Sequence, residues 1–325
     1  MREAVILGNT NLGYSWFVLT HLDGLIHNGW NVHQIDYKST PLDSIKRMLI
    51  SIKPDYVFTH LTFHQNVHST PIVLQMYREV HKKVGTKFIH TLNDARIIDR
   101  YMEDIEGAVY AAFVGNTACI ETCEKAWGVP VYFSPYSSLT YDQMAKPVKE
   151  LSFQHPVFTG SPGAHKDRAS FLQKLKDRIP VQIFKTQSNG DLRHRTPELS
   201  VSAKCILGLC TGYDIDHYID VRPFQYMGTG AVFIARKFKN MDDIIPEYLY
   251  YPFDGYSNND ADYVKKLWKK FIENSDNTYT RQEAFNFIQK YHSAKVRISD
   301  VIDVLDGKRE NVRSFKWDWS DDINL

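Results

Sequence analysis

The residues with the clearest chemical potential lie in the segment YDIDHYIDVRPFQYMGTG, which ends at Gly230. Arg222 falls near the start of a helix that we expect over residues 220–227, where free backbone N–H groups and the helix dipole favour an anion. A guanidinium at that place can bind a diphosphate through two parallel hydrogen bonds. Gln225 follows about one turn later and can reach a ribose hydroxyl of the same ligand. Gly228 and Gly230 allow a sharp turn and close approach to a ligand. The alternative is a helix with an ordinary surface arginine and a C-terminal glycine.

Glycine-rich phosphate loops of the common kinds are missing from the sequence. Four residues separate Gly8 from Gly13 after the first expected strand, so no G-x-G-x-x-G pattern of a nicotinamide-binding enzyme forms there. Asp36, in the second expected strand, is the acidic residue that such a pattern would need, but it does not make a nicotinamide site without the glycines. Its simpler interpretation is a solvated residue at the end of a strand. The loop from Gly160 to Gly163 is equally unlike a dinucleotide or Walker loop. The sequence therefore argues against a dehydrogenase and against a P-loop kinase.

The elements that must position these residues alternate between strand and helix in the first half of the chain. Strands that alternate with helices pair in parallel, because a parallel neighbour needs a crossover that is usually helical. The predicted fold class is therefore doubly wound α/β. The expected strands cover residues 4–7, 31–37, 56–59, 87–92, 108–113 and 129–133, and the expected helices cover residues 16–27, 42–52, 72–83 and 117–127.

The alternation pauses over residues 134–150 and then restarts. Two α/β halves of this size predict two Rossmann-like lobes that face a cleft, with ligands bound beyond the carboxyl ends of the strands. We expect one lobe over residues 1–145, a second over 146–305 and a C-terminal tail over 306–325. In the second lobe the expected strands cover residues 156–159, 181–184, 205–209 and 231–235, and the expected helices cover residues 167–177, 220–227, 263–273 and 282–305.

Composition places the chain among ordinary globular proteins. Its 325 residues, 43% hydrophobic and 24% charged, are enough for two domains with cores of their own. The chain has 39 Lys and Arg and 38 Asp and Glu, so its net charge is close to zero. It therefore lacks the strongly positive electrostatic potential that is typical of proteins that bind nucleic acid or membrane surfaces. We see neither a membrane-spanning stretch nor a signal-peptide pattern. Four cysteines exclude a disulfide scaffold and suit a reducing cytoplasm. We predict a cytoplasmic protein, in the host cytoplasm if a phage encodes it.

Several residue groups have a plainer interpretation. The four cysteines lack the C-x2-C spacing of a zinc knuckle, so we expect small buried apolar side chains. Two groups of basic residues are expected to be solvated, although they leave a polyanion such as DNA as an alternative acceptor. Trp317 and Trp319 either pack the tail onto the first lobe, which we favour, or mark an interface. The cysteines and basic residues are Cys119, Cys123, Cys205, Cys210, Arg193, His194, Arg195, Lys265, Lys266, Lys269 and Lys270.

Short motifs follow one another in a fixed order through the second half. They are FTG at 158–160 with Arg168 downstream, KCIL at 204–207, RPFQ at 222–225 with Gly228 and Gly230, the stretches 242–251 and 260–271, and YHSAKVR at 291–297. This order resembles the glycosyltransferase-like domain of the spore-maturation CgeB type, a family of the two-lobed GT-B nucleotide-sugar transferases. The first lobe resembles that family only in its alternation of strands and helices.

The resemblance implies a glycosyltransferase, either a hexosyl- or a pentosyltransferase. Such an enzyme moves a sugar from a nucleotide diphosphate to an acceptor hydroxyl, and we expect a UDP-sugar as donor. The resemblance also suggests that the anomeric configuration is retained and that no metal or other cofactor is required. The lobe over 146–305 would bind the donor, and the lobe over 1–145 would bind the acceptor. The acceptor itself, whether glycan, small molecule or modified DNA, is left open.

The resemblance assigns the donor residues one by one. Arg222 is the diphosphate-side cation, with a catalytic role as well, and Gln225 takes the place of the family's usual helix glutamate. An amide accepts ribose hydroxyls less strongly than a carboxylate. The related Glu-x7-Glu pattern would put its first member at His217, which is also not a carboxylate, so an atypical donor or a reduced activity is expected. Four further donor residues are expected around the preceding loop, where the charged pair has a solvated helix start as its alternative: Gly160, Ser161, Lys166 and Arg168.

Acceptor residues are expected where strands of the first lobe end. Asp94 could orient or deprotonate an acceptor hydroxyl, and its competing role is the N-cap of the following segment. His60, His64 and His68 are spaced four residues apart, but no acidic ligand lies near them, so a metal site is not expected. We assign His60 to the catalytic group and His64 to the acceptor site. Three loop residues complete the acceptor candidates: Asn9, Asn11 and Gly13.

Two rival functions stay open. One is a phage-type DNA glycosyltransferase that acts on a hydroxymethylated base, which must be pulled from the stack and needs a basic groove. The other is a non-catalytic binding protein that keeps the GT-B fold, since His217 and Gln225 stand where carboxylates are expected.

Overall fold

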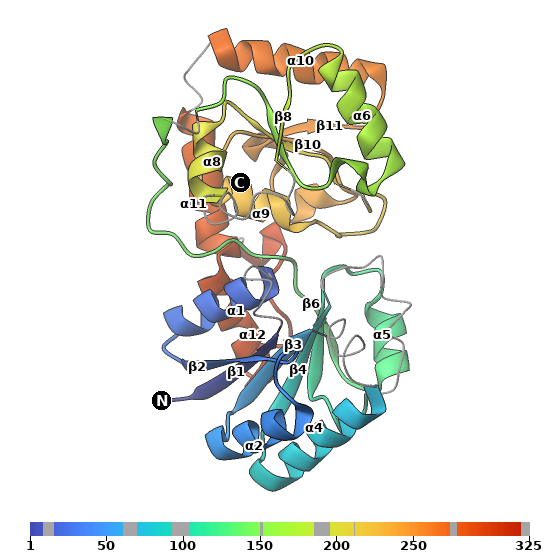
Figure 1. Ribbon diagram of the computed structural model, residues 1–325, viewed down its shortest axis with the longest axis vertical. Coiled ribbons are helices and arrows are strands. Elements are labelled where there is room, and N and C mark those ends of the chain that lie inside the picture. Colours follow the sequence, from blue (N-terminus) through green and yellow to red (C-terminus); the bar gives the residue numbers. More distant parts are fainter. Residues whose placement is uncertain are drawn as a thin grey trace. The chain divides into compact units, whose positions relative to one another are not determined.

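The computed structural model describes residues 1–8, 16–60, 70–92, 105–149, 152–184, 196–210, 212–273 and 278–319. The chain divides into two compact units, each with a sheet of its own (Figure 1). Unit 1 comprises Met1–Thr140, Ile215–Tyr218 and Ala294–Ser314, and unit 2 comprises Tyr141–Asp214, Ile219–Ser293 and Phe315–Leu325.

Unit 1 contains a six-stranded sheet in the order β2-β1-β3-β4-β5-β6, and every neighbouring pair is parallel. The strand order reverses between β1 and β3, as in doubly wound sheets. The strands are β1 (Glu3–Gly8), β2 (Asn31–Asp36), β3 (Tyr56–His60), β4 (Lys87–Leu92), β5 (Ala111–Val114) and β6 (Val131–Phe133). The helices are α1 (Trp16–His27), α2 (Leu42–Ile52), α4 (Thr70–Val84), α5 (Ile120–Trp127) and α12 (Ala294–Leu305).

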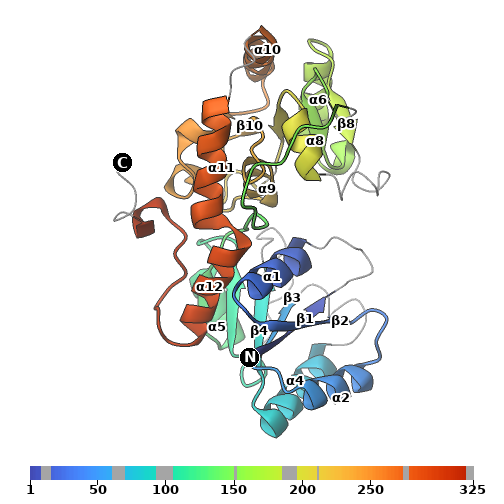
Figure 2. The same cartoon turned by 90° about the vertical axis from the view of Figure 1, so that its left-hand side faces the viewer.

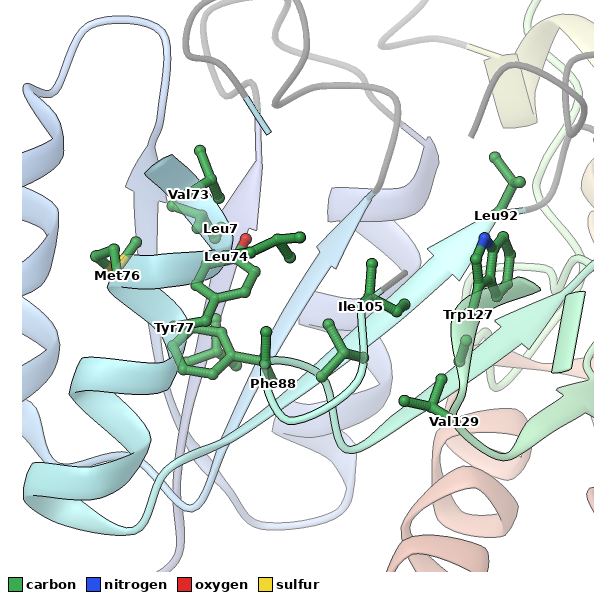
Figure 3. Packing of buried hydrophobic residues seen from close by; sticks show 14 of the residues in the cluster. Leu7, Val73, Leu74, Met76, Tyr77, Phe88, Leu92, Ile105, Trp127 and Val129 are labelled. Carbon is green, nitrogen blue, oxygen red and sulfur yellow. The ribbon is translucent and has the colours of Figure 1, made fainter. Parts of the chain in front are cut away.

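The sheet of unit 1 is buried on both faces, because alternate residues of each strand point to opposite sides. Val5 and Leu7 pack with helices α2, α4 and α5, where the rings of Tyr77 and Phe88 stack with centroids 3.9 Å apart (Figure 3). Ala4 and Ile6 point to the other face, which α1 and α12 cover (Figure 2).

Unit 2 contains a five-stranded parallel sheet in the order β11-β10-β9-β7-β8. Its order reverses between β7 and β9, so a ligand site is expected at the carboxyl ends of these two strands. The strands are β7 (Val157–Thr159), β8 (Gln182–Phe184), β9 (Ile206–Gly208), β10 (Phe233–Arg236) and β11 (Tyr251–Phe253). The helices are α6 (Lys166–Lys176), α8 (Thr196–Ser202), α9 (Val221–Met227), α10 (Asn258–Glu273) and α11 (Thr278–His292).

Helices cover both faces of the second sheet as well. Helices α6 and α10 pack together over one face and share a core with Leu207 and Ile234. Helix α9 packs against β9 and β10 and against α11, and Gln289 of α11 donates a hydrogen bond to the Gly228 carbonyl at 2.8 Å. The predicted α/β class, with two Rossmann-like units, is confirmed. Strand β11 and helix α8 were not predicted.

The prediction of a single helix over 282–305 is wrong, and so are the predicted bounds of the two lobes at this part of the chain. Helices α11 and α12 are separated at Ser293, and α12 belongs to unit 1, not to the lobe expected over 146–305. The break follows from packing, because the apolar side of α12 is buried against the first sheet. The tail also differs from expectation, since residues 306–314 belong to unit 1 but Trp319 packs on Tyr291 of unit 2, with ring centroids 4.9 Å apart.

Two expectations from composition can be compared with the described part of the chain. All four cysteines are buried and free, which confirms that they are small core side chains. Among the residues that the structure describes, no helix combines the length and apolarity needed to cross a membrane.

Candidate functional site

Arg222 is the second residue of α9, as the expected helix start placed it. Asp220 is the N-cap, and its carboxylate accepts a hydrogen bond from the Arg222 backbone N–H at 2.9 Å. The same carboxylate also accepts from Nη1 of the Arg222 guanidinium. The Asp220 carboxylate therefore caps the start of α9 and also orients the Arg222 guanidinium. The first is the usual function of an aspartate N-cap, and the second is a charge-assisted hydrogen bond.

The Arg222 guanidinium lies at the point where the strand order of unit 2 reverses. Its Nη1 is 3.6 Å from Sγ of Cys210, just beyond β9, and its Nη2 approaches Gly160, just beyond β7. The side chain is 19% exposed, so ligand can still reach it. Burial alone lowers the pKa of Arg222, but the Asp220 carboxylate more than offsets this and the net pKa is raised. The guanidinium is therefore a permanent cation.

Arg168 supplies a second guanidinium at the same place. It comes from α6, is 5% exposed, and donates from Nη1 to the Ser161 carbonyl at 3.1 Å. Burial, and then the positive charge of Arg222, lower the pKa of Arg168. Its Nε has no hydrogen-bond partner in the part of the chain that the structure describes. Within the described residues, Asp220 is the one carboxylate that pairs with either arginine.

One buried and one half-buried cation against a single paired carboxylate leave an excess of positive charge among the described residues. Both guanidiniums also lie over the Phe158 ring, at 5.8 Å for Arg168 and 6.0 Å for Arg222. Buried charges in proteins are normally paired, and an uncompensated one is costly. The arrangement is therefore suited to an anion that brings at least one further negative charge.

Gly160 lets the arginines approach the end of β7. Its φ is +134°, which L side chains rarely adopt, and a Cβ there would lie 2.9 Å from Nη2 of Arg222. The Gly160 N–H donates to the Phe184 carbonyl at 2.9 Å, so the residue also continues the pairing of β7 with β8. A side chain at this position would displace either the backbone or the guanidinium.

The other predicted donor residues take different positions. Ser161 is exposed, and its carbonyl contacts Arg168. Lys166 is exposed at the first position of α6. Gln225 is half-buried about one turn after Arg222, and its side chain has no hydrogen-bond partner in the described part of the chain. The structure thus brings together Gly160, Ser161, Arg168 and Arg222.

The glycines after α9 have structural roles. Gly228 ends the helix in the right-handed conformation, with φ −64°. Gly230 has φ +89°, and a Cβ on it would lie 2.5 Å from Sδ of Met144. A side chain at position 230 would therefore collide with Met144, and the close approach to a ligand that the sequence predicts at Gly228 and Gly230 stays a prediction.

His217 stands where the related pattern has its first glutamate. Its φ is +53°, unusual for a residue with a side chain, and its Nδ1 is hydrogen-bonded to Oγ1 of Thr117 at 2.8 Å. Both residues belong to unit 1.

The catalytic and acceptor candidates of the first lobe are described only in part. His60 ends β3, is half-buried, and meets the Phe17 ring edge-on with centroids 5.6 Å apart. No group of three or more His, Cys, Asp or Glu suited to a metal ion occurs among the described residues. The remaining candidates lie outside the described residues: Asn9, Asn11, Gly13, His64 and Asp94.

Sequence reasoning missed three residues of this site. Asp220 could have been recognised, because an aspartate directly before a predicted helix is an N-cap signal. Cys210 and Tyr256 carry no such signal, since the hydrogen bond from the Tyr256 hydroxyl to the Cys210 carbonyl joins residues far apart in sequence, at 2.7 Å.

The architecture can be compared with solved structures. The Anabaena protein HepE in complex with UDP-glucose is 9% identical, with TM-score 0.62 over 94% of this chain and 100% of that one. An α-glucosyltransferase solved with UDP-glucose and DNA containing an abasic site is 11% identical, with TM-score 0.64 over 94% and 99% of the two chains. Sucrose-phosphate synthase from Thermosynechococcus elongatus is 10% identical, with TM-score 0.59 over 95% and 100%.

The chain has the GT-B fold. The likeness to these three structures extends over nearly the whole chain and therefore includes both Rossmann-like units. Its sequence matches no protein-family model and no curated protein. The resemblance to the CgeB type therefore stays a prediction.

Proposed function

We propose that this protein is a glycosyltransferase that takes its sugar from a UDP-sugar and transfers it to an acceptor hydroxyl. The observation that carries the proposal is a pair of guanidiniums at the strand-order reversal of unit 2, the buried Arg168 and the half-buried Arg222, with Asp220 as the one carboxylate that pairs with either within the described residues. Two of the structures with the same fold contain UDP-glucose. The order of motifs through the second half of the chain supports a transferase of the CgeB type.

The chemistry of such a transfer fits two fixed cations. As the bond from the sugar to the diphosphate breaks, negative charge grows on the leaving phosphate oxygens. Donors that are already oriented stabilise this charge without reorganising, and they are most effective in a site that excludes water. Arg222 is oriented by Asp220 and Arg168 by the Ser161 carbonyl, so both guanidiniums are held in place before ligand binds.

Gln225 is the proposed ribose ligand, and Gly160 and Ser161 the proposed loop contacts of the donor. Unit 1 is proposed to bind the acceptor, with His60 and Asp94 acting on its hydroxyl, and the transfer is proposed to retain the anomeric configuration. A bound metal or other cofactor is not required by this mechanism, because the arginines carry the charge compensation.

A specific observation favours modified DNA as the second candidate acceptor. The α-glucosyltransferase with the same fold was solved with DNA. Lys265, Lys266, Lys269 and Lys270 of α10 form no ion pair within the described residues, so these four amines are available to a phosphate backbone, although Asp262 and Glu273 lie on the same surface. Salt-sensitive DNA binding would distinguish this acceptor from a glycan or a small molecule.

Calorimetric titration with UDP, UDP-glucose and pyrophosphate tests the donor site. Wild-type protein is expected to bind all three. Arg222→Gln is expected to weaken all three by roughly thirtyfold, about 2 kcal/mol, because charge-assisted hydrogen bonds to the diphosphate are lost. Arg168→Gln should act in the same direction. Lys176→Gln, an exposed residue at the end of α6, is the control and should bind as the wild type does.

Two outcomes would contradict the proposal. If the wild type binds none of the three ligands, or if Arg222→Gln binds them as tightly as the wild type, the donor site is wrong. Binding without release of sugar, in an assay with candidate acceptors, would instead support the non-catalytic binding protein.

A further inference from the structure

The Cys210 thiol lies beside two charged groups of the candidate donor site. Cys210 follows β9 by two residues and is buried, and its sulfur accepts a hydrogen bond from Nη1 of Arg222 at 3.6 Å. The thiol is also hydrogen-bonded to the Asp220 carboxylate. Because that carboxylate accepts from Nη1 as well, the three side chains form a closed set of hydrogen bonds.

The protonation state of the thiol allows it both contacts. Burial, and then the negative charge of Asp220, raise the pKa of Cys210 well above its usual range. The thiol is therefore protonated at neutral pH, so its S–H can donate to the carboxylate while the sulfur accepts from the guanidinium. An apolar side chain at this position could do neither.

The backbone of Cys210 is attached to the core of unit 2. The Tyr256 hydroxyl donates to the Cys210 carbonyl at 2.7 Å. Tyr256 in turn packs on Phe171 of α6, with ring centroids 4.9 Å apart, and on Phe253 of β11, with ring centroids 6.3 Å apart. The sulfur is therefore fixed to the scaffold, as a group that orients a flexible arginine must be.

The two contacts of Nη1 determine which edge of the guanidinium is available to a ligand. Asp220 and Cys210 both engage Nη1. Nη2 forms no hydrogen bond with the described residues, and it lies toward Gly160, where a Cβ would be 2.9 Å from it. The Nη2 edge therefore faces the loop after β7.

We propose that Cys210 is a positioning residue, whose thiol and Asp220 together hold Nη1 of Arg222 so that Nη2 is presented to the diphosphate of the donor. A free arginine side chain has many rotamers, and a ligand binds more tightly when that freedom is lost before it arrives. This inference rests on the proposed function, because it presumes a diphosphate at Arg222. It adds that the affinity for the diphosphate depends on an uncharged thiol as well as on the charges.

Calorimetric titration with pyrophosphate tests the role of the thiol. Cys210→Val fills a similar volume without a polar atom and is expected to bind pyrophosphate roughly fivefold more weakly than the wild type. Cys210→Ala, which cannot crowd the site, should act in the same direction. Cys210→Ser keeps a donor and an acceptor, so it is expected to bind within about twofold of the wild type.

Cys205 provides a matched control. It directly precedes β9, so it lies at the opposite end of that strand from Cys210, and it is also buried. Cys205→Val makes the same substitution away from the arginines and should leave the pyrophosphate affinity unchanged. Thermal unfolding of each variant verifies that the fold is intact.

A double variant separates positioning from packing. If the thiol acts through Arg222, Cys210→Val should weaken pyrophosphate binding no further in protein that already carries Arg222→Gln. A packing effect would instead have the same size with and without the arginine.

The outcomes separate this inference from the proposed function. The inference is overturned if Cys210→Val and Cys210→Ala bind pyrophosphate as the wild type does, if Cys205→Val or Cys210→Ser weakens binding as much as Cys210→Val, or if the weakening persists beside Arg222→Gln. In each of these cases the donor site stands on its charges alone. If the wild type binds neither pyrophosphate nor UDP, the proposed function and the inference fall together.

Discussion

Gly160 combines two requirements in one residue, since its backbone is left-handed and its missing side chain makes room for Arg222. Gly160→Ala is expected to lower the free energy of unfolding by about 1–2 kcal/mol, from the strained φ, and to weaken UDP binding by displacing the guanidinium. Thermal unfolding and titration with UDP measure the two effects.

Gly163 provides a matched control for that substitution. It lies in the 3₁₀ helix Pro162–Ala164 of the same loop, and a Cβ added to it meets no atom within 4 Å. Gly163→Ala should therefore leave both stability and UDP affinity close to wild type. Equal effects of the two substitutions would show that Gly160 has no special relation to Arg222.

At the scale of single residues, the sequence predicts what local rules determine. The place of Arg222 at a helix start could be predicted, because a helical segment over 220–227 that ends at two glycines is a local signal. The burial of Arg168 could not, because its partners Ser161, Phe158 and Arg222 are brought together only by the folded sheet.

Helices α1 and α12 meet at Gly24 with no space for a side chain. A Cβ there would lie 2.5 Å from the Ala294 carbonyl oxygen, a backbone atom that cannot move away alone. Asn28 holds the same contact from α1, with Nδ2 donating to the Lys295 carbonyl at 2.8 Å. The two helices therefore pack at backbone distance.

Gly24→Ala is expected to destabilise the protein by about 1–3 kcal/mol, because the added methyl group forces the two helices apart. Chemical denaturation followed by circular dichroism measures the loss. Ile26→Ala, at a residue of the same helix that is 55% exposed, should change stability by less than about 0.5 kcal/mol. A Gly24→Ala variant as stable as the wild type would mean that α12 is not held in this position.

Strands and helices in the first half of the chain were predicted to within three residues at each end, since buried parallel strands are short apolar segments between turn residues. The error over 282–305 has a physical cause. Ser293 is a single polar residue between two helical patterns, and nothing local shows that the second helix packs on a sheet formed by the first half of the chain. Long-range packing overrides a locally continuous helix signal.

The protein as a whole should lose stability in mild acid because of one buried histidine. His21 is 9% exposed, and Nδ1 donates to the Phe17 carbonyl at 2.8 Å. Burial lowers the pKa of His21 to about 4, and the hydrogen bond only partly offsets this. The unfolded chain has the ordinary histidine pKa of about 6.5, so between these values it binds a proton that the folded chain does not.

The sign of the effect follows directly. The contribution of His21 is fully present above pH 6.5 and declines as the pH falls towards 4, by about 3 kcal/mol in total. Denaturant titrations at pH 7 and pH 4.5 measure the change. Replacing His21 with Gln should remove this part of the pH dependence, whereas replacing the exposed His27 of the same helix should not. Parallel pH profiles for wild type and the His21 variant would refute the assignment.

The buried cysteines give the protein built-in reporters of local opening. Cys119 and Cys123 belong to unit 1, and Cys205 and Cys210 belong to unit 2. A thiol that lies inside the core is alkylated only when the structure around it opens locally, so the labelling rate measures how often that opening occurs. Because the reporters are divided two and two, peptide mass spectrometry can follow each unit separately in the unmodified protein. A nucleotide held by the arginines would slow labelling at Cys205 and Cys210 first.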